Sequence, residues 1–384
     1  MSAPSVKSAV ADPPIPLLDL SRAHGPLAAE LARDFERVLT SGQFILGPEH
    51  DAFEKDLAVS AGVKHAIGVS SGTSAISIGL EALGIGPGDE VVVPAFTYFA
   101  TASAVAQTGA RPVFADVEPR RYGLAPDSME AAITPRTRAI VPVHLYGLAC
   151  DLTTLRSIAD RRGIPILEDA AQAIGATSDG RPVGSETAGA VLSFFPTKNL
   201  GALGDAGAIL TERDDVAARA RLLRAQGDAG NYRHTALGTN ARLDALQAVF
   251  LRTKLRHLAS WTEARRAVAA RYRAALEGSP VALPEEPEGS RHTYHQFTIR
   301  APRRDALQKA LAERGIASRV YYPIPLPAQP VFAEGGWRAA DFPISVRLSE
   351  EVLSIPIFPG LTDVEIDRVA GAIHDFYRSG TGSR

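Results

Sequence analysis

One stretch of the sequence sets a single lysine among aromatic residues, small residues and glycines: Ser193-Phe194-Phe195-Pro196-Thr197-Lys198-Asn199-Leu200-Gly201-Ala202-Leu203-Gly204-Asp205-Ala206-Gly207. Lysines normally lie on wetted faces of a protein, so Lys198 is out of place unless it has a function. Burial lowers the pKa of a lysine from about 10.4 and turns its ammonium into an amine nucleophile. Lys198 is therefore a candidate catalytic residue, with an ordinary surface lysine as the alternative.

The sequence around this stretch predicts an α/β fold. Between Ala66 and Ala208, short apolar runs alternate with helix-like segments. Runs that are apolar throughout are typical of strands covered on both faces, as in a mainly parallel sheet wrapped by helices. The predicted strands are residues 66–69, 91–93, 112–114, 139–143, 164–167 and 190–192.

The length of the chain indicates more than one domain. At 384 residues it exceeds the roughly 250–300 residues at which one hydrophobic core stops growing. We expect a large α/β domain over residues 15–255 and a smaller α+β domain over residues 256–384, with residues 1–14 as a disordered leader. Residues 214–278 are expected to form long helices, and residues 294–299 a strand that opens the second domain.

The composition excludes several classes of protein. Lys plus Arg number 41 and Asp plus Glu 43, which gives no electrostatic argument for binding nucleic acid or an anionic membrane. No apolar stretch approaches the roughly 20 residues of a membrane span. Cys150 is the only cysteine, so it forms no internal disulfide and no zinc site by itself. We expect a cytoplasmic protein without a metal centre.

A turn rich in small residues follows the first predicted strand. Residues 70–74 read Ser-Ser-Gly-Thr-Ser and precede a helix-compatible segment. Such a turn exposes backbone N–H groups at the positive end of a helix dipole, where a phosphate can bind. Gly72 and Thr73 are therefore candidate anion ligands, with a simple N-capped helix as the alternative.

Two further predicted strands end in residues suited to a ring-shaped ligand. Tyr98 follows the strand at residues 91–93, at a carboxyl strand end where open α/β sheets form their ligand crevice. Its ring could stack on a planar ligand or pack in the core. Asp169 follows the strand at residues 164–167, with Gln172 three residues on. A carboxylate there can hold a heterocyclic N–H⁺, and capping of a helix is the alternative.

Together with the polar helix entry at residues 238–248, these stretches resemble the fold-type I aminotransferases of the DegT/StrS class, which make amino sugars on nucleotide carriers. The resemblance runs from Ile15 to near the C-terminus. Supporting stretches are residues 42–49, 86–91 and 320–326. The resemblance implies a large domain with a mainly parallel mixed sheet wrapped by helices, and a smaller α+β C-terminal domain.

The resemblance also implies a cofactor, pyridoxal 5'-phosphate, which alternates with its pyridoxamine form. By this resemblance, Lys198 carries the cofactor as a Schiff base and acts as the base that moves a proton. Asp169 keeps the pyridine nitrogen protonated, so that the ring accepts electrons. Gln172 bonds the phenolic oxygen, and Tyr98 stacks on the ring.

The phosphate site and the substrate site are implied in the same way. The backbone amides of Gly72 and Thr73 bind the phosphate, with hydroxyls from Thr73 and Ser193. Asn240 reaches the phosphate of the neighbouring subunit, so a homodimer with shared active sites is expected. Tyr322 is assigned to the substrate.

Two positions depart from the family pattern. Ser71 stands where many relatives carry asparagine, and the turn chemistry stays compatible with a serine. Pro327 stands where a histidine often follows the Tyr-Pro-x-Pro-Leu pattern. This second departure affects the loop that is expected to contact the substrate.

The activity that the resemblance implies is transamination of a TDP- or UDP-linked keto sugar, with glutamate as the amino donor. The loop around Lys198 resembles the branches that aminate C-3, while C-4 stays open. One alternative is a sugar dehydratase with the same cofactor, in which histidine replaces the anchoring lysine. The other is a non-catalytic regulatory or sensor protein of the same fold.

Overall fold

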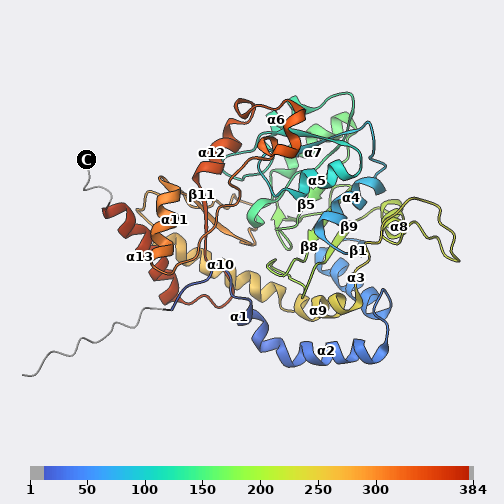
Figure 1. The fold of residues 1–384 in the computed structure, drawn as a ribbon, viewed down its shortest axis with the longest axis horizontal. Coiled ribbons are helices and arrows are strands. Elements are labelled where there is room, and N and C mark those ends of the chain that lie inside the picture. The colour runs from blue at the N-terminus through green and yellow to red at the C-terminus, as the bar shows by residue number, and fades with distance from the viewer. Residues whose placement is uncertain (1–12, 380–384) are drawn as a thin grey trace, which may run out of the picture.

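The structure is a computed structural model that describes residues 13–379. The predicted leader, residues 1–14, lies almost wholly outside the described residues. A broad α/β body carries a smaller C-terminal lobe at one side (Figure 1). No helix within residues 13–379 is long and apolar enough to cross a membrane.

The body is built on two groups of strands that meet edge to edge. One group has the order β1-β9-β8-β5, and the other has the order β3-β2-β4. Bridges from Ile140 to Ile166 and from Val143 to Asp169 join β4 to β5. The strands are β1 (His65–Val69), β2 (Glu90–Pro94), β3 (Arg111–Ala115), β4 (Thr137–Ile140), β5 (Leu167–Asp169), β8 (Gly189–Ser193) and β9 (Gly207–Thr211).

The strand directions place the carboxyl ends of most strands at one edge of the sheet. Pairing is parallel between β2 and β3, β2 and β4, and β5 and β8. Strand β9 is antiparallel to both of its neighbours, β1 and β8. All strands except β9 therefore end at the same edge, which confirms the prediction of a mainly parallel, mixed sheet.

Two predicted strands have different limits in the structure, and β9 was not predicted. The strand predicted at residues 139–143 is β4 (Thr137–Ile140), and the one predicted at residues 164–167 is β5 (Leu167–Asp169). Both predicted runs contain a proline, which has no N–H for the ladder, and near both the sheet continues as isolated bridges.

Helices cover both faces of this sheet. They are α3 (Pro48–Ala61), α4 (Gly72–Ala82), α5 (Ala100–Gln107), α6 (Pro126–Ala132), α7 (Leu152–Arg162), α8 (Asp214–Leu223) and α9 (Ala245–Leu255), while α2 (Ala28–Ser41) packs against α9. The short strands β6 (Thr177–Ser178) and β7 (Arg181–Pro182) form a separate ribbon. Strand residues such as Ile67, Val92 and Val191 are fully buried, which explains why their runs are apolar throughout.

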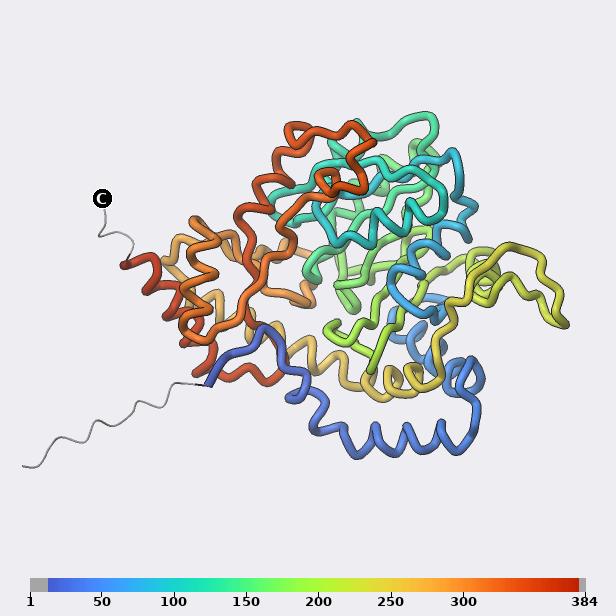
Figure 2. The backbone as a smooth tube through the Cα atoms, viewed as in Figure 1, coloured from blue at the N-terminus to red at the C-terminus, as the bar shows by residue number. Residues whose placement is uncertain are grey.

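The region predicted as long helices is interrupted. Residues 224–244 form an irregular excursion between α8 and α9, which Figure 2 shows extending away from the body. Helix α10 (Leu258–Ala275) then leads to the C-terminal lobe. The prediction of helix across residues 214–278 is therefore wrong for residues 224–244, where Gly227, Gly230 and Asn231 adopt positive φ angles.

The C-terminal lobe has its own core. Strands β10 (Phe297–Arg300) and β11 (Val352–Ile355) pair antiparallel, and α10, α11 (Arg304–Glu313) and α13 (Asp363–Ser379) pack around them. The predicted strand at residues 294–299 begins later, because Tyr294 has a φ of 45°. Helix α12 (Pro343–Glu351) returns to the body, where Asp116 accepts hydrogen bonds from the backbone of Ile344 and Ser345.

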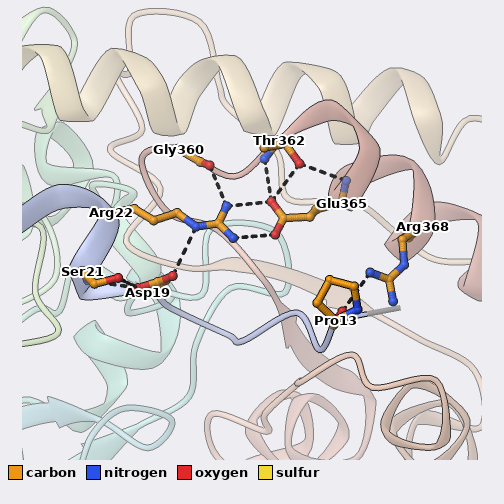
Figure 3. Close-up of polar contacts among 8 residues, drawn as sticks. All are labelled: Pro13, Asp19, Ser21, Arg22, Gly360, Thr362, Glu365 and Arg368. Atoms are coloured by element: carbon orange, nitrogen blue, oxygen red, sulfur yellow. Dashed lines mark hydrogen bonds and ion pairs between the residues drawn. The ribbon is translucent and has the colours of Figure 1, made fainter. Parts of the chain in front are cut away.

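An ion-pair network joins the N-terminal segment to this lobe (Figure 3), beside the backbone hydrogen bonds of Ile15 with Gly315 and Ala317. Arg22 lies in α1 (Leu20–His24). Its guanidinium forms two hydrogen bonds of 2.6 and 2.7 Å with the carboxylate of Glu365 in α13. Arg22 also donates to the carbonyl of Gly360, and Asp19 accepts from Arg22. The hydrogen bond from Arg22 lowers the pKa of Glu365 to about 2, so the pair stays ionised near neutral pH.

Candidate active site

The carboxyl ends of β1, β2, β5 and β8 enclose a cavity of about 350 Å³. This is the edge where an open α/β sheet is expected to bind its ligand. The cavity brings together eight of the nine predicted site residues: Gly72, Thr73, Tyr98, Asp169, Gln172, Ser193, Lys198 and Tyr322. A larger surface hollow of about 530 Å³ lies near Asp89 and Arg138 and contains none of them.

Lys198 enters the cavity from the loop between β8 and β9. Its backbone N–H bonds the carbonyl of Phe195 at 2.8 Å, so the lysine sits on a tight turn. Loss of hydration lowers the pKa of Lys198 from 10.5 to about 8, against the opposing charge of Asp169. Lys198 therefore lines a cavity and has a lowered pKa, while its role as the catalytic residue stays a prediction.

Asp169 is held at the end of β5 by two hydrogen bonds. Thr101 Oγ1 donates to its Oδ2 at 2.8 Å, and the N–H of Ala171 donates to its Oδ1 at 3.1 Å. Burial raises the pKa of Asp169, while these two donors and the nearby Lys198 oppose the rise. No helix follows, since residues 170–176 form turns, so Asp169 does not cap a helix.

Strand alternation separates the two neighbouring acids. Glu168 points away from the cavity, where it accepts from Thr187 Oγ1 at 2.6 Å and lies 2.9 Å from His144 Nε2. Successive side chains of a strand face opposite sides of the sheet, so only one of the two carboxylates can face the ligand. The structure places Asp169 in that position.

The start of α4 offers a cradle for an anion. Ser71 caps the helix by accepting from the N–H of Ser74 at 3.1 Å, while the N–H groups of Gly72 and Thr73 take no partner within residues 13–379. A Cβ on Gly72 would lie 2.7 Å from the Cβ of Ser193, so no side chain fits between them. The close approach leaves backbone N–H groups and the hydroxyls of Thr73 and Ser193 facing the cavity.

Gln172 links the two sides of the cavity. Its Oε1 accepts from the backbone N–H of Tyr146 at 2.7 Å, and its Nε2 donates to the hydroxyl of Tyr322 at 3.0 Å. Burial raises the pKa of Tyr322, which keeps this hydroxyl protonated. The amide is thus fixed with one donor hydrogen left for a ligand.

Tyr98 lies at the mouth of the cavity, where 57% of its surface is exposed. Its ring centre is 5.9 Å from that of Tyr322, and the two rings are tilted by 40°. A core position, which was the alternative for Tyr98, is excluded by this exposure. The ring is placed to cover a planar ligand that enters the cavity.

Asn240 is the one predicted site residue that this chain does not bring to its own cavity. It is exposed within the excursion of residues 224–244, and its Oδ1 accepts from Arg242 at 2.8 Å. The backbone next to it does reach the anion cradle, since the carbonyl of Ala241 accepts from Ser70 N–H at 2.9 Å.

Several lining residues were not found from the sequence. Thr101 sits 68 positions before its partner Asp169, so their contact depends on the packing of α5 against the strand ends. His295 and Gln296 reach the cavity from the C-terminal segment just before β10. They lie in the Tyr-His-Gln-Phe run, which was identified from the sequence only as a strand. The polar residues within this run were the signal that could have indicated a contact with the site.

The residues present fit a phosphorylated pyridine aldehyde. One end of the cavity offers free N–H groups and hydroxyls for a phosphate, at Gly72, Thr73 and Ser193. Asp169 supplies a carboxylate for a protonated ring nitrogen, and Lys198 supplies an amine for an aldehyde carbon. These are the three functional groups that such a cofactor presents.

Known proteins match the chain along nearly its whole length. It is 47% identical to a pleiotropic regulatory protein of Geobacillus stearothermophilus, over 95% of this chain and 99% of that protein. It is 46% identical to the UDP-N-acetyl-3-dehydro-alpha-D-glucosamine 3-aminotransferase of Acidithiobacillus ferrooxidans, over 94% of this chain and 97% of that enzyme. The crystal structure of S. venezuelae DesV in complex with a ketimine intermediate has a TM-score of 0.93 at 44% identity, covering 95% and 98%.

The model of one family spans most of the body and of the C-terminal lobe. The DegT/DnrJ/EryC1/StrS aminotransferase family matches residues 27–374, a range that includes every residue assigned to the cavity. The chain therefore belongs to the DegT/DnrJ/EryC1/StrS aminotransferase family.

Proposed function

We propose that this protein is a pyridoxal-phosphate-dependent aminotransferase that converts a nucleotide-linked keto sugar into an amino sugar, with glutamate as the amino donor. One observation carries the proposal: the desolvated amine of Lys198 and the buried carboxylate of Asp169 share a cavity with a free helix N-terminus. The lone Cys150 and the absence of a spanning helix within residues 13–379 favour a cytoplasmic location.

When bound, the cofactor supplies an aldehyde carbon that carries the amino group and a ring that accepts electrons. Gly72, Thr73 and Ser193 would hold its phosphate through N–H groups and hydroxyls. Gln172 would donate its second amide hydrogen to the phenolic oxygen. Tyr98 would cover the ring from the mouth of the cavity and exclude water.

Lys198 serves first as the amine that holds the cofactor and then as the base. A pKa of about 8 gives it a far larger neutral fraction near neutral pH than an exposed lysine has. With cofactor and substrate bound, its neutral amine would take a proton from the substrate carbon and hold that proton on Nζ for return. Both steps need an unprotonated amine inside the cavity.

Asp169 keeps a proton on the ring nitrogen. A charge pair with the N–H⁺ favours the ionised carboxylate, against the burial that raises its pKa. Thr101 and the N–H of Ala171 support the same charge state. These two donors therefore hold the carboxylate in position and favour its ionised form.

The cavity argues against both alternatives. A dehydratase of this family carries histidine where Lys198 stands. A purely regulatory protein, as the name of the Geobacillus relative suggests for that protein, has no need of the full set of Lys198, Asp169, Gln172 and Ser193 facing one cavity. Catalysis accounts for all four residues together.

The substrate is proposed at the level of its chemical class. The Acidithiobacillus relative is named for a 3-keto sugar on UDP, which supports amination at C-3 over C-4. TDP and UDP both remain candidates for the carrier. We also propose a homodimer in which Asn240 completes the phosphate site of the partner, because it lies outside the cavity of its own chain.

We expect the purified enzyme to transfer an amino group from glutamate to one member of a panel of TDP- and UDP-linked 3-keto and 4-keto sugars. Mass spectrometry of the products identifies both the carrier and the aminated sugar. Lys198→Ala serves as the matched control and should give no product. Failure with every sugar, with cofactor bound, would contradict the proposed substrate class.

Replacing Asp169 with asparagine should leave the fold intact and lower turnover by about a hundredfold or more, because a neutral amide does not stabilise the protonated ring nitrogen. Thr101→Val keeps the carboxylate and loses one donor, so its loss should be smaller, about tenfold or less.

The Asp169→Asn variant should also change the pH dependence of cofactor binding. Cofactor capture by the cofactor-free protein should accelerate as the pH rises through about 8, where the ammonium of Lys198 loses its proton. Asp169→Asn should move this inflection to lower pH, since the carboxylate no longer favours the ammonium. Absorbance of the bound cofactor, followed over time at each pH, measures both the rate of capture and the pH of the inflection. An unchanged inflection with normal turnover would show that Asp169 has no such role.

Mixing Lys198→Ala chains with Asn240→Ala chains should restore activity if the sites are shared. Each heterodimer would then have one site without a lesion and one with both, so about half of the native activity is expected in a two-fold symmetric dimer. Steady-state assays of purified heterodimers measure this recovery.

The reverse arrangement is the control. A chain carrying both substitutions, paired with a native chain, places one lesion in each site and should be no more active than the impaired Asn240→Ala enzyme. Equal activity of the two kinds of heterodimer would contradict the shared-site proposal.

A further inference from the structure

Lys254 is a second buried lysine, and it lies outside the cavity. It is 0% exposed in α9, and no carboxylate of residues 13–379 forms an ion pair with it. Its Nζ donates to the carbonyl oxygen of Gly201 at 2.5 Å. Burying a charged group without a counter-charge is costly, so this contact is a candidate for a specific task.

The carbonyl that Lys254 holds belongs to the loop of Lys198. Gly201 packs against Pro196, since a Cβ on Gly201 would lie 2.2 Å from the carbonyl oxygen of Pro196. The loop is closed by a further hydrogen bond of 2.7 Å from Ala202 N–H to the carbonyl of Phe194. A shift of Gly201 is therefore passed on to the turn that carries Lys198.

A second side chain of α9 contacts the same loop. Gln247 Oε1 accepts from the backbone N–H of Leu203 at 2.8 Å. Gln247 and Lys254 are seven residues apart, which places them on one face of a helix, two turns from each other. That face holds one carbonyl and one N–H of the loop, at Gly201 and Leu203.

Helix α9 is itself fixed independently of the loop. Thr253 Oγ1 donates to Asp34 in α2 at 2.5 Å. The helix begins where Ala245 N–H bonds the carbonyl of Phe44 at 2.8 Å. The segment just before it accepts from Ser70, next to the anion cradle. One continuous stretch of chain thus touches both the cradle and the lysine loop.

We propose that α9 positions Lys198 by clamping its loop, with Lys254 at Gly201 and Gln247 at Leu203 as positioning residues. The inference rests on the proposed function for the role of Lys198 as the reacting amine. A small misplacement of a reacting group can cost a large factor in rate, so a loosened loop lowers kcat while the binding groups for the nucleotide sugar stay in place.

The test compares Lys254→Met and Gln247→Leu with the native enzyme. In Lys254→Met, hydrogen exchange of the amides of residues 199–205 should accelerate about tenfold, because one charge-assisted hydrogen bond to the loop is lost. Mass spectrometry of the full-length, cofactor-loaded protein measures this. In the same protein kcat should fall about tenfold while KM for the nucleotide sugar changes less than about twofold.

Thr253→Val is the matched control. It removes a neighbouring buried polar group of α9 that bonds Asp34 and does not touch the loop. It should lower the thermal midpoint and leave exchange at residues 199–205 unchanged. Should Lys254→Met fail to fold, Gln247→Leu decides by the same exchange measurement.

Exchange like that of the native enzyme in the folded clamp variants, or equal acceleration in Thr253→Val, would overturn the clamp. Accelerated exchange in a protein that transfers no amino group would leave the clamp standing and reject the proposed function instead. The two inferences therefore fail separately.

Discussion

The whole site depends on keeping one amine out of water and opposite one carboxylate. Lys198 would be an ordinary ammonium on a wet surface, and its pKa of about 8 comes from burial in a cavity that the strand ends enclose. The surrounding residues must therefore be small or apolar, yet leave room for a ligand. The charge of Asp169 limits how far burial lowers the pKa of Lys198, because it favours the ammonium form. These opposing demands explain why a lysine occurs among glycines and aromatics.

Features with a local sequence signal could be predicted, and contacts that arise from tertiary packing could not. Apolar runs such as residues 91–93 predicted the sheet, and the outlying Lys198 predicted the chemistry, because both signals are local. Strand limits were wrong near Pro142 and Pro165, where pairing continues through bridges. Thr101 could not be predicted, since its contact with Asp169 arises only when α5 packs against the sheet edge.

Helix α9 connects features that lie far apart in the chain. Its first turn follows Asn240, which we propose to act on the partner subunit, and its inner face contacts the Lys198 loop. Ser70, beside the anion cradle, bonds the segment between them. Dimer formation, phosphate binding and placement of the amine would thus depend on one short stretch, residues 240–254. From its residues alone, that stretch was identified as a polar entry into an amphipathic helix, and the role of Asn240 came from the family resemblance.

The most direct test asks which lysine carries the cofactor. Borohydride reduces a carbon–nitrogen double bond between cofactor and lysine to a stable bond, and peptide mapping then locates the attachment. The site geometry predicts attachment at Lys198 and none at Lys254, the other lysine of residues 13–379 with a pKa lowered to about 8. Attachment at Lys254 or at any other lysine, or no attachment in protein that carries the cofactor, would contradict the account.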